Sequence, residues 1–234
     1  MPGRYSARRL PLFRRRAIWL PTVWGALLLL ALTIAAVCAI GASAYRFLAL
    51  NEPARGPDGS GARTLVVEGW LDPPQLAGAV AAFRRGRYDR VLTTGGPIDP
   101  WIDAGGWGNF ALRAAHLLRS QGLVEVPVIA VPAPETQRDR TYLSATMVRE
   151  WAVRSKIELG AVDVHSVGPH ARRTRALYRL ALGDAVEVGV LAAPPRGGGF
   201  ERWWASSEAA KSVSTEALGL AWTTCCFWPE RPAP

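Results

Sequence analysis

The sequence predicts an α/β domain preceded by one N-terminal transmembrane helix, and two observations carry this prediction. Residues 23–44 form an uncharged apolar run of 22 residues, which is long enough to cross a bilayer as a helix. From residue 64 onward, short β-branched runs alternate with longer stretches of helical periodicity. Strands that alternate with helices form parallel sheets through right-handed crossovers. We therefore expect a Rossmann-like, doubly wound and mainly parallel sheet with helices on both faces.

Composition divides the chain into five parts. The 234 residues are 49% hydrophobic and 20% charged, which suits one globular domain with its own core plus additional segments. Pro, Gly and polar residues follow the apolar run and predict a flexible linker before the domain. The expected parts are a basic cytoplasmic N-terminus (1–22), the anchor (23–47), the linker (48–62), the α/β domain (63–228) and a tail (229–234).

The net charge of +9 is concentrated near the N-terminus. Residues 1–50 hold seven of the 28 basic residues and no acidic one, so the other 184 residues carry 21 basic against 19 acidic side chains. Six arginines precede the apolar run and only Arg46 follows it closely. The positive-inside rule then predicts a single-pass protein of the plasma (inner) membrane, with a cytoplasmic N-terminus and an exported domain. The nearly neutral domain argues against nucleic acid as a partner.

A cleaved signal peptide is the alternative to an anchor. Residues 42–44 read Ala-Ser-Ala, which is an acceptable small-residue cleavage pattern. The apolar core of a signal peptide usually has about 7–15 residues, however, and the run here is longer. We therefore favour an uncleaved anchor that inserts in the lipid bilayer, and either alternative exports the domain.

Five strands and four helices are expected in the domain, in alternating order. The expected strands cover residues 64–67, 91–93, 126–131, 162–167 and 186–191. The expected helices cover residues 74–85, 109–121, 141–156 and 171–182. Residues 217–228 are apolar but too short to span a membrane, so we expect a further helix packed on the domain.

Distinctive polar or glycine segments follow the first four strands. They are Glu68-Gly69-Trp70, Thr94-Gly95-Gly96, Arg138-Asp139-Arg140-Thr141 and the segment from Gly168 to Arg173. Because the carboxyl ends of parallel strands meet at one edge of a sheet, we expect these segments to line one crevice.

The chemistry of these segments suits an anion. Arg138, Arg140, Arg172 and Arg173 offer forked donors for phosphate or carboxylate, and helix N-termini add oriented N–H groups. The predicted excess of cationic groups indicates an anionic ligand. Any one of these residues could equally be structural: the glycine pair an ordinary turn, Asp139 a helix cap, the arginines a solvated first turn.

The positions of the cysteines and the absence of standard motifs exclude several kinds of site. Cys38 lies in the apolar run, and Cys225 and Cys226 are adjacent, so they form no framework and no metal-like spacing. We expect no metal site. A phosphate-binding Gly-x-x-x-x-Gly-Lys loop and a Gly-x-Ser-x-Gly elbow are missing from the sequence. The sequence identifies no cofactor.

Several motifs together resemble the SanA/ElyC/YdcF-like family of bacterial envelope-associated proteins. The motifs are Leu65 to Leu71, Tyr88-Asp89, Thr93 to Pro97, Arg138 to Tyr142 with Ser144-Ala145, His170 to Arg173, and Arg202-Trp203-Trp204 with Ser206 to Glu208. The resemblance covers about residues 63–228. It implies a Rossmann-like domain, often behind a membrane segment, with a role in envelope integrity, peptidoglycan precursor supply or lipid-carrier metabolism.

The matching positions imply the site. They are the glycine pair, Asp139 to Thr141 with Ser144, and His170 with Arg172 and Arg173. Many members of the family carry Asn where this chain has Arg140, which suggests a branch with a more basic site.

We therefore expect a membrane-anchored envelope protein that binds a phosphorylated or otherwise anionic ligand, such as a lipid-linked precursor or a carrier lipid. Two other classes stay open: a non-catalytic nucleotide or S-adenosylmethionine-type binding module, and a scaffold for other envelope-biogenesis proteins. Candidates for acid–base work are Glu68, Asp139 and His170. The expected ligand-binding residues are Gly69, Trp70, Thr94, Gly95, Gly96, Arg138, Arg140, Thr141, Ser144, Arg172 and Arg173.

Overall fold

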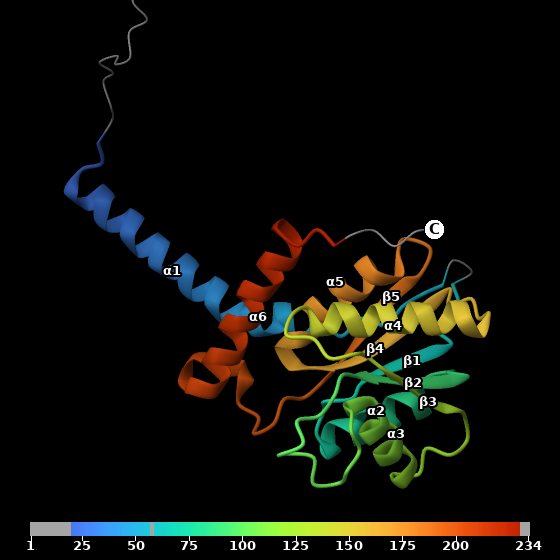
Figure 1. Cartoon of the computed structure of the whole chain (residues 1–234). Helices are drawn as coiled ribbons and strands as arrows, with labels where there is room; N and C mark the ends of the chain where they lie inside the picture. The colour runs from blue at the N-terminus through green and yellow to red at the C-terminus, as the bar shows by residue number, and fades with distance from the viewer. Residues whose placement is uncertain (1–19, 57–58, 230–234) are drawn as a thin grey trace, which may run out of the picture. The chain divides into compact units, whose positions relative to one another are not determined.

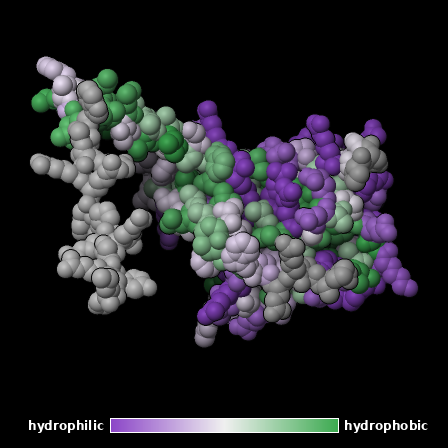
Figure 2. Space-filling view, turned by 90° about the horizontal axis from the view of Figure 1, so that it is seen from above, coloured by the Kyte–Doolittle hydropathy of each residue, from purple (hydrophilic) through white to green (hydrophobic). Residues whose placement is uncertain are grey.

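The computed structural model describes residues 20–56 and 59–229, which form two units, 1–41 and 42–234. In the first unit lies most of helix α1 (Val23–Leu48), the one helix of the described residues that is long and apolar enough to cross a membrane. Figure 2 shows hydrophobic residues gathered along this helix. The predicted basic segment and tail lie almost wholly outside the described residues, which exclude 1–19 and 230–234.

The second unit is built on a five-stranded parallel sheet. Its strands are β1 (Thr64–Glu68), β2 (Arg90–Gly95), β3 (Val128–Pro132), β4 (Ala161–Val167) and β5 (Glu187–Ala193). Their order is β3-β2-β1-β4-β5, and every neighbouring pair is parallel, which confirms the predicted Rossmann-like class. The order reverses direction between β1 and β4. In folds of this kind ligands bind beyond the strand ends at that point.

Helices cover both faces of the sheet, as Figure 1 shows. Helices α2 (Pro73–Arg85) and α3 (Phe110–Ser120) pack on one face, and α4 (Arg140–Ser155) and α5 (Ala171–Leu182) pack on the other. Successive strand residues point to opposite faces. Leu65 and Val67 therefore join the core under α2 and α3, whereas Val66 joins the core under α4 and α5.

The segment that follows α1 is held against the domain, so the expected flexible linker is wrong for its first part. Glu52 forms an antiparallel bridge with Val190 of β5, and the N–H of Ala54 donates to Oδ1 of Asp163 at 2.7 Å. A buried carboxylate needs hydrogen-bond partners, and this one is also satisfied by the hydroxyl of Tyr88 at 2.7 Å. Gly189 makes the contact possible, because a Cβ there would lie 2.1 Å from the nitrogen of Ala54.

The last helix is longer than the predicted 217–228. It is α6 (Ser207–Cys225), capped by the hydroxyl of Ser206 and preceded by a short helical turn, η2 (Phe200–Ala205). Ala209 and Val213 of α6 pack with Phe200 and with Leu48, the last residue of α1. The helix also packs against α5 and against η1 (Gly168–His170), the turn that follows β4. This places α6 across the carboxyl edge of the sheet (Figure 1).

The adjacent cysteines at the end of α6 are joined as a disulfide. As the sequence indicated, this bond closes no larger loop.

Candidate functional site

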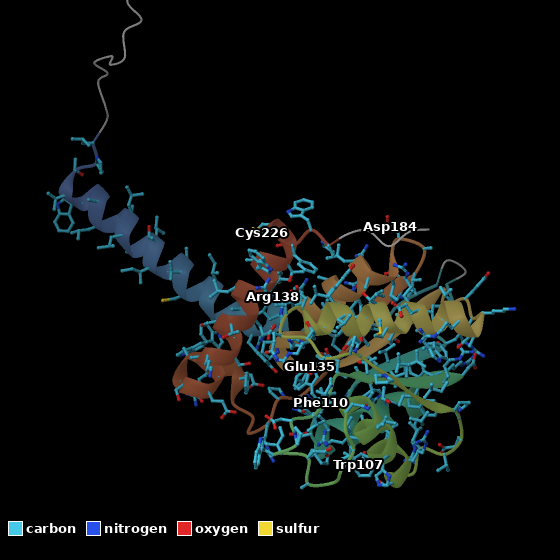
Figure 3. All side chains as sticks on the ribbon, viewed as in Figure 1. Trp107, Phe110, Glu135, Arg138, Asp184 and Cys226 are labelled. Carbon is cyan, nitrogen blue, oxygen red and sulfur yellow. A yellow bond between two sulfur atoms is a disulfide. The ribbon has the colours of Figure 1, made fainter. Side chains whose placement is uncertain are left out.

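A cavity of about 690 Å³ opens at the carboxyl edge of the sheet, between the strand ends and α6. We call it the crevice. Eleven of the fourteen predicted site residues line it, from all four predicted segments: Glu68, Trp70, Thr94, Gly95, Gly96, Asp139, Arg140, Thr141, Ser144, His170 and Arg173. Phe110, at the start of α3, lines it too and is labelled in Figure 3. The predicted convergence of the segments is confirmed, while the roles of the residues stay predictions.

Three predicted residues do not line the crevice. Gly69 is buried behind it, where a Cβ would lie 2.4 Å from the carbonyl oxygens of Phe110 and Thr94. Glycine is needed there for packing. Arg138 is exposed on the loop before α4, and its backbone N–H donates to the hydroxyl of Thr136 at 3.1 Å. The third residue, Arg172, faces a different part of the domain.

Arg172 contacts the end of α1. Its Nε donates to the carbonyl of Phe47, and its guanidinium carbon lies 3.9 Å from the centroid of the Phe47 ring. A cation at a helix C-terminus satisfies carbonyl groups that the helix leaves open. The expectation that Arg172 helps to form the crevice is therefore wrong, because successive helical residues project about 100° apart.

The two glycines after β2 have different roles. Gly95 has φ +145°, and a Cβ there would lie 2.6 Å from Cβ of Phe110, so this position requires glycine. At Gly96 a Cβ would meet no atom closer than 3.6 Å. Both glycines line the crevice, but only Gly96 is free of a packing requirement.

A buried carboxylate forms the floor of the crevice. Glu68 ends β1 and is only 3% exposed. Its Oε2 accepts from the hydroxyl of Ser166 at 2.5 Å, and its Oε1 lies 3.3 Å from Oγ1 of Thr174 and 3.5 Å from Nε2 of His170. These partners compensate for the loss of water around the charge.

His170 lies between two carboxylates. Its Nδ1 is 3.0 Å from Oε1 of Glu216 on α6, and its Nε2 faces Glu68. Burial alone would lower the pKa of His170, but the two carboxylates raise it to about 9. Nη2 of Arg173 also lies 3.0 Å from Nδ1, a bond that only a neutral ring accepts. With a carboxylate on each side, we assign the protonated form, in which Nδ1 donates to Glu216.

Glu216 is the site residue that the sequence analysis missed. Both its oxygens accept from Arg173, with Nε to Oε2 at 2.7 Å and Nη2 to Oε1 at 3.1 Å. Burial alone would raise the pKa of Glu216, but His170 and Arg173 lower it to about 2. The fork of Arg173 is thus directed at Glu216. This ion-pair chain joins the sheet edge to α6.

The charges of the crevice are balanced, so the predicted excess of cationic groups is wrong. Three acidic residues (Glu68, Asp139 and Glu216) face three basic ones (Arg140, His170 and Arg173). The difference arises because α6 contributes a carboxylate, while two of the predicted arginines lie elsewhere.

The start of α4 is the open positive part of the crevice. Asp139 precedes the helix with φ 50° and ψ 36° and makes no side-chain cap, so its side chain does not satisfy the first N–H groups. A left-handed backbone at a residue other than glycine costs about 1 kcal/mol or more and is often found at functional sites. Arg140 is exposed beside it, and Thr141 and Ser144 complete this side. Within the described residues, no ion pair to Arg140 is found.

Two aromatic side chains contribute to the side of the crevice next to α6, beside the polar Ser212, Glu216 and Thr223 of that helix. Trp222 and Phe227 line it, and the ring of Phe227 meets that of Tyr142 edge-on, with centroids 5.2 Å apart. Across the crevice, Trp70 packs edge-on against His170 at 5.5 Å. The crevice therefore combines polar groups at the strand ends and on α6 with aromatic side chains near the end of α6.

Comparison of the chain with protein-family models, curated proteins and solved structures finds no match. The functional argument therefore rests on the geometry of the crevice.

Proposed function

We propose that the crevice binds the phosphate of an amphiphilic ligand, and that the chain is a membrane-anchored cell-envelope protein that supports envelope or peptidoglycan biogenesis. The observation that carries this proposal is the uncapped start of α4, with Arg140 beside it, in a cavity that Trp222 and Phe227 also line. Helix N–H groups and a guanidinium are strong phosphate donors. A lipid-linked precursor or a carrier lipid carries both a phosphate and an apolar tail.

The placement of the anchor supports this class of ligand. A helix long enough to span the bilayer runs into the domain without a loose connection, because residues 48–55 are packed on it. A ligand held in the membrane is then within reach of the domain. The resemblance to the SanA/ElyC/YdcF-like family supports the same role.

The protonation state of His170 sets what chemistry the crevice offers. With a pKa near 9, His170 carries a proton at neutral pH and is suited to be an acid or a fixed positive charge, not a base.

Binding of farnesyl phosphate to the full chain in detergent micelles, measured by isothermal titration calorimetry, tests the proposal. Farnesol and inorganic phosphate are the comparison ligands. We expect farnesyl phosphate to bind more tightly than either. Arg140→Gln should weaken binding by about tenfold, as expected for the loss of one charge-assisted hydrogen bond. Arg154→Gln, another exposed arginine of α4, lies outside the crevice lining and is the matched control.

Three results would contradict the proposal. Equal binding of farnesol and farnesyl phosphate would show that the phosphate is not recognised. Tighter binding of S-adenosylmethionine or a nucleotide would favour the non-catalytic binding module, and no binding of any of these ligands would favour the scaffold.

A further inference from the structure

A second cavity, of about 750 Å³, lies beside the end of α1. We call it the basic groove. It is bounded by Phe47 and Leu50, by the outer face of α5 and by the end of α6 with Trp228. Two residues near the end of α6, Thr223 and Phe227, line both the basic groove and the crevice.

One side of the basic groove is a row of arginines. Arg172, Arg175 and Arg179 lie three and four residues apart on α5 and therefore share one helix face. Arg175 is neutralised by Glu52 at 2.9 Å and by Glu187 at 3.8 Å.

Arg172 and Arg179 have no such acidic partner in the described residues. Across the part of the chain that the structure describes, no carboxylate lies within ion-pair distance of Arg172 or Arg179. Asp184 is the one acidic residue in the described lining. Burial and the neighbouring charge of Arg175 lower the pKa of Arg172, as expected where positive charge is not fully compensated.

The rest of the rim of the basic groove is apolar and open to solvent. Trp228 is 84% exposed, Phe47 54% and Leu180 41%. Large exposed aromatic groups of this kind favour the headgroup depth of a bilayer. The uncharged run of α1 ends at Ala44, only three residues before Phe47, so chain connectivity alone puts this rim at the edge of the span.

We propose that the basic groove binds an anionic phospholipid of the surrounding bilayer, with its phosphate on Arg172 and Arg179 and its acyl chains along the apolar rim. Unpaired arginines match the charge of the headgroup. The rim continues directly from the membrane helix, which makes a bilayer lipid the fitting occupant. This site lies outside the proposed ligand contacts at the start of α4 and does not depend on them.

Native mass spectrometry of the full chain released from detergent micelles tests the proposal. The chain is titrated with phosphatidylglycerol and, in parallel, with phosphatidylcholine. We expect phosphatidylglycerol to stay bound. Arg179→Gln should weaken its binding by about tenfold, whereas Arg179→Lys should keep most of it, because the charge remains. Trp228→Ala should weaken it through the apolar rim, and Arg154→Gln should leave it unchanged.

Arg179 and Trp228 are exposed, so their replacement should leave the melting temperature unchanged, and a lost lipid then reports a lost contact. Equal retention of both lipids, or full retention in Arg179→Gln, would overturn the proposal. Displacement of the lipid by glycerol phosphate at equal concentration would overturn it too, since the apolar rim would then contribute nothing. Binding of farnesyl phosphate should be the same in Arg179→Gln and in the unaltered chain, which separates this site from the crevice.

Discussion

Oε1 of Glu216 lies 3.0 Å from Nδ1 of His170, although the two residues belong to different elements, α6 and η1. Through His170 the contact reaches Glu68 at the end of β1, and through Glu216 it reaches Arg173 on α5. Positive and negative side chains therefore alternate in this series of ion pairs, which joins the edge of the sheet to α6, the helix that covers it. The first two predictions concern the protonation of His170 and Glu216.

Glu216→Gln should lower the pKa of His170. The substitution keeps the shape of the side chain and removes one of the two charges that hold the proton, so the pKa should fall from about 9 by roughly one unit or more. NMR titration of the His170 ring in the full chain in micelles measures this change. Glu208→Gln, an exposed site in the first turn of the same helix, is the control and should leave the pKa unchanged. An unchanged pKa in Glu216→Gln would mean that Nδ1 is bonded to Arg173 instead.

The stability of the domain should depend on pH at both ends of the range. The pKa of Glu216 is lowered from 4.5 to about 2, so its contribution is complete above pH 4.5 and is lost as the pH falls through 2. The pKa of His170 is raised from 6.5 to about 9, so its contribution is complete below pH 6.5 and is lost as the pH rises through 9.

The two pKa shifts give a plateau of this contribution between pH 4.5 and 6.5. Thermal unfolding of the full chain at a series of pH values measures it. The double variant Glu216→Gln, His170→Gln should show a weaker dependence at both ends. The same slopes in the unaltered chain and the double variant would place the titrating groups elsewhere.

Gly69→Ala should destabilise the domain, whereas Gly96→Ala should have little effect. A Cβ at Gly69 clashes with two backbone carbonyl oxygens, which cannot move as a side chain can. Overpacking of this kind costs about 1–3 kcal/mol, and a substitution without a clash stays within about 0.5 kcal/mol. The midpoint of chemical denaturation reports the difference. Similar midpoints for the two variants would contradict this prediction and would show that the turn after β1 can shift to accommodate a Cβ at residue 69.

The membrane topology can be tested independently of the site. The arginines before the apolar run predict that the N-terminus is cytoplasmic and the domain exported. Alkaline phosphatase fused after residue 60 should be active, and a reporter that requires the cytoplasm should be inactive at the same position. The opposite pattern would contradict the predicted orientation.

Much of the fold could be predicted because strands and helices have different periods. The helix over residues 171–182 was predicted with its observed bounds, and each strand was found within a few residues. Strand order could not be predicted, because the hydrophobic pattern of a buried parallel strand does not specify its neighbours. The segments at the strand ends were nevertheless correctly placed at one edge, since parallel strands all end on the same side.

There are physical reasons why the sequence did not reveal every residue of the site. Residues 207–216 are mostly polar and do not resemble a packed helix, so Glu216 was overlooked. One signal was available: Ala209, Val213 and Glu216 recur at helical spacing, which puts a carboxylate on a buried stripe. Arg172 and Arg173 were treated as a pair, but successive helical residues project about 100° apart, and here Arg173 faces the crevice while Arg172 contacts the end of α1.

The bridge between Glu52 and Val190 shortens the free segment that connects the domain to the apolar run. A free linker of fifteen residues would have given it a radius of about 20 Å around its attachment point. With residues 48–55 packed on the domain, the free stretch between the apolar run and the domain is much shorter than such a linker. For the lipid-linked ligand that we propose, and with α1 in the bilayer, the encounter of the domain with its ligand becomes a two-dimensional search, whose rate depends on the density of the ligand in the membrane rather than on its concentration in solution.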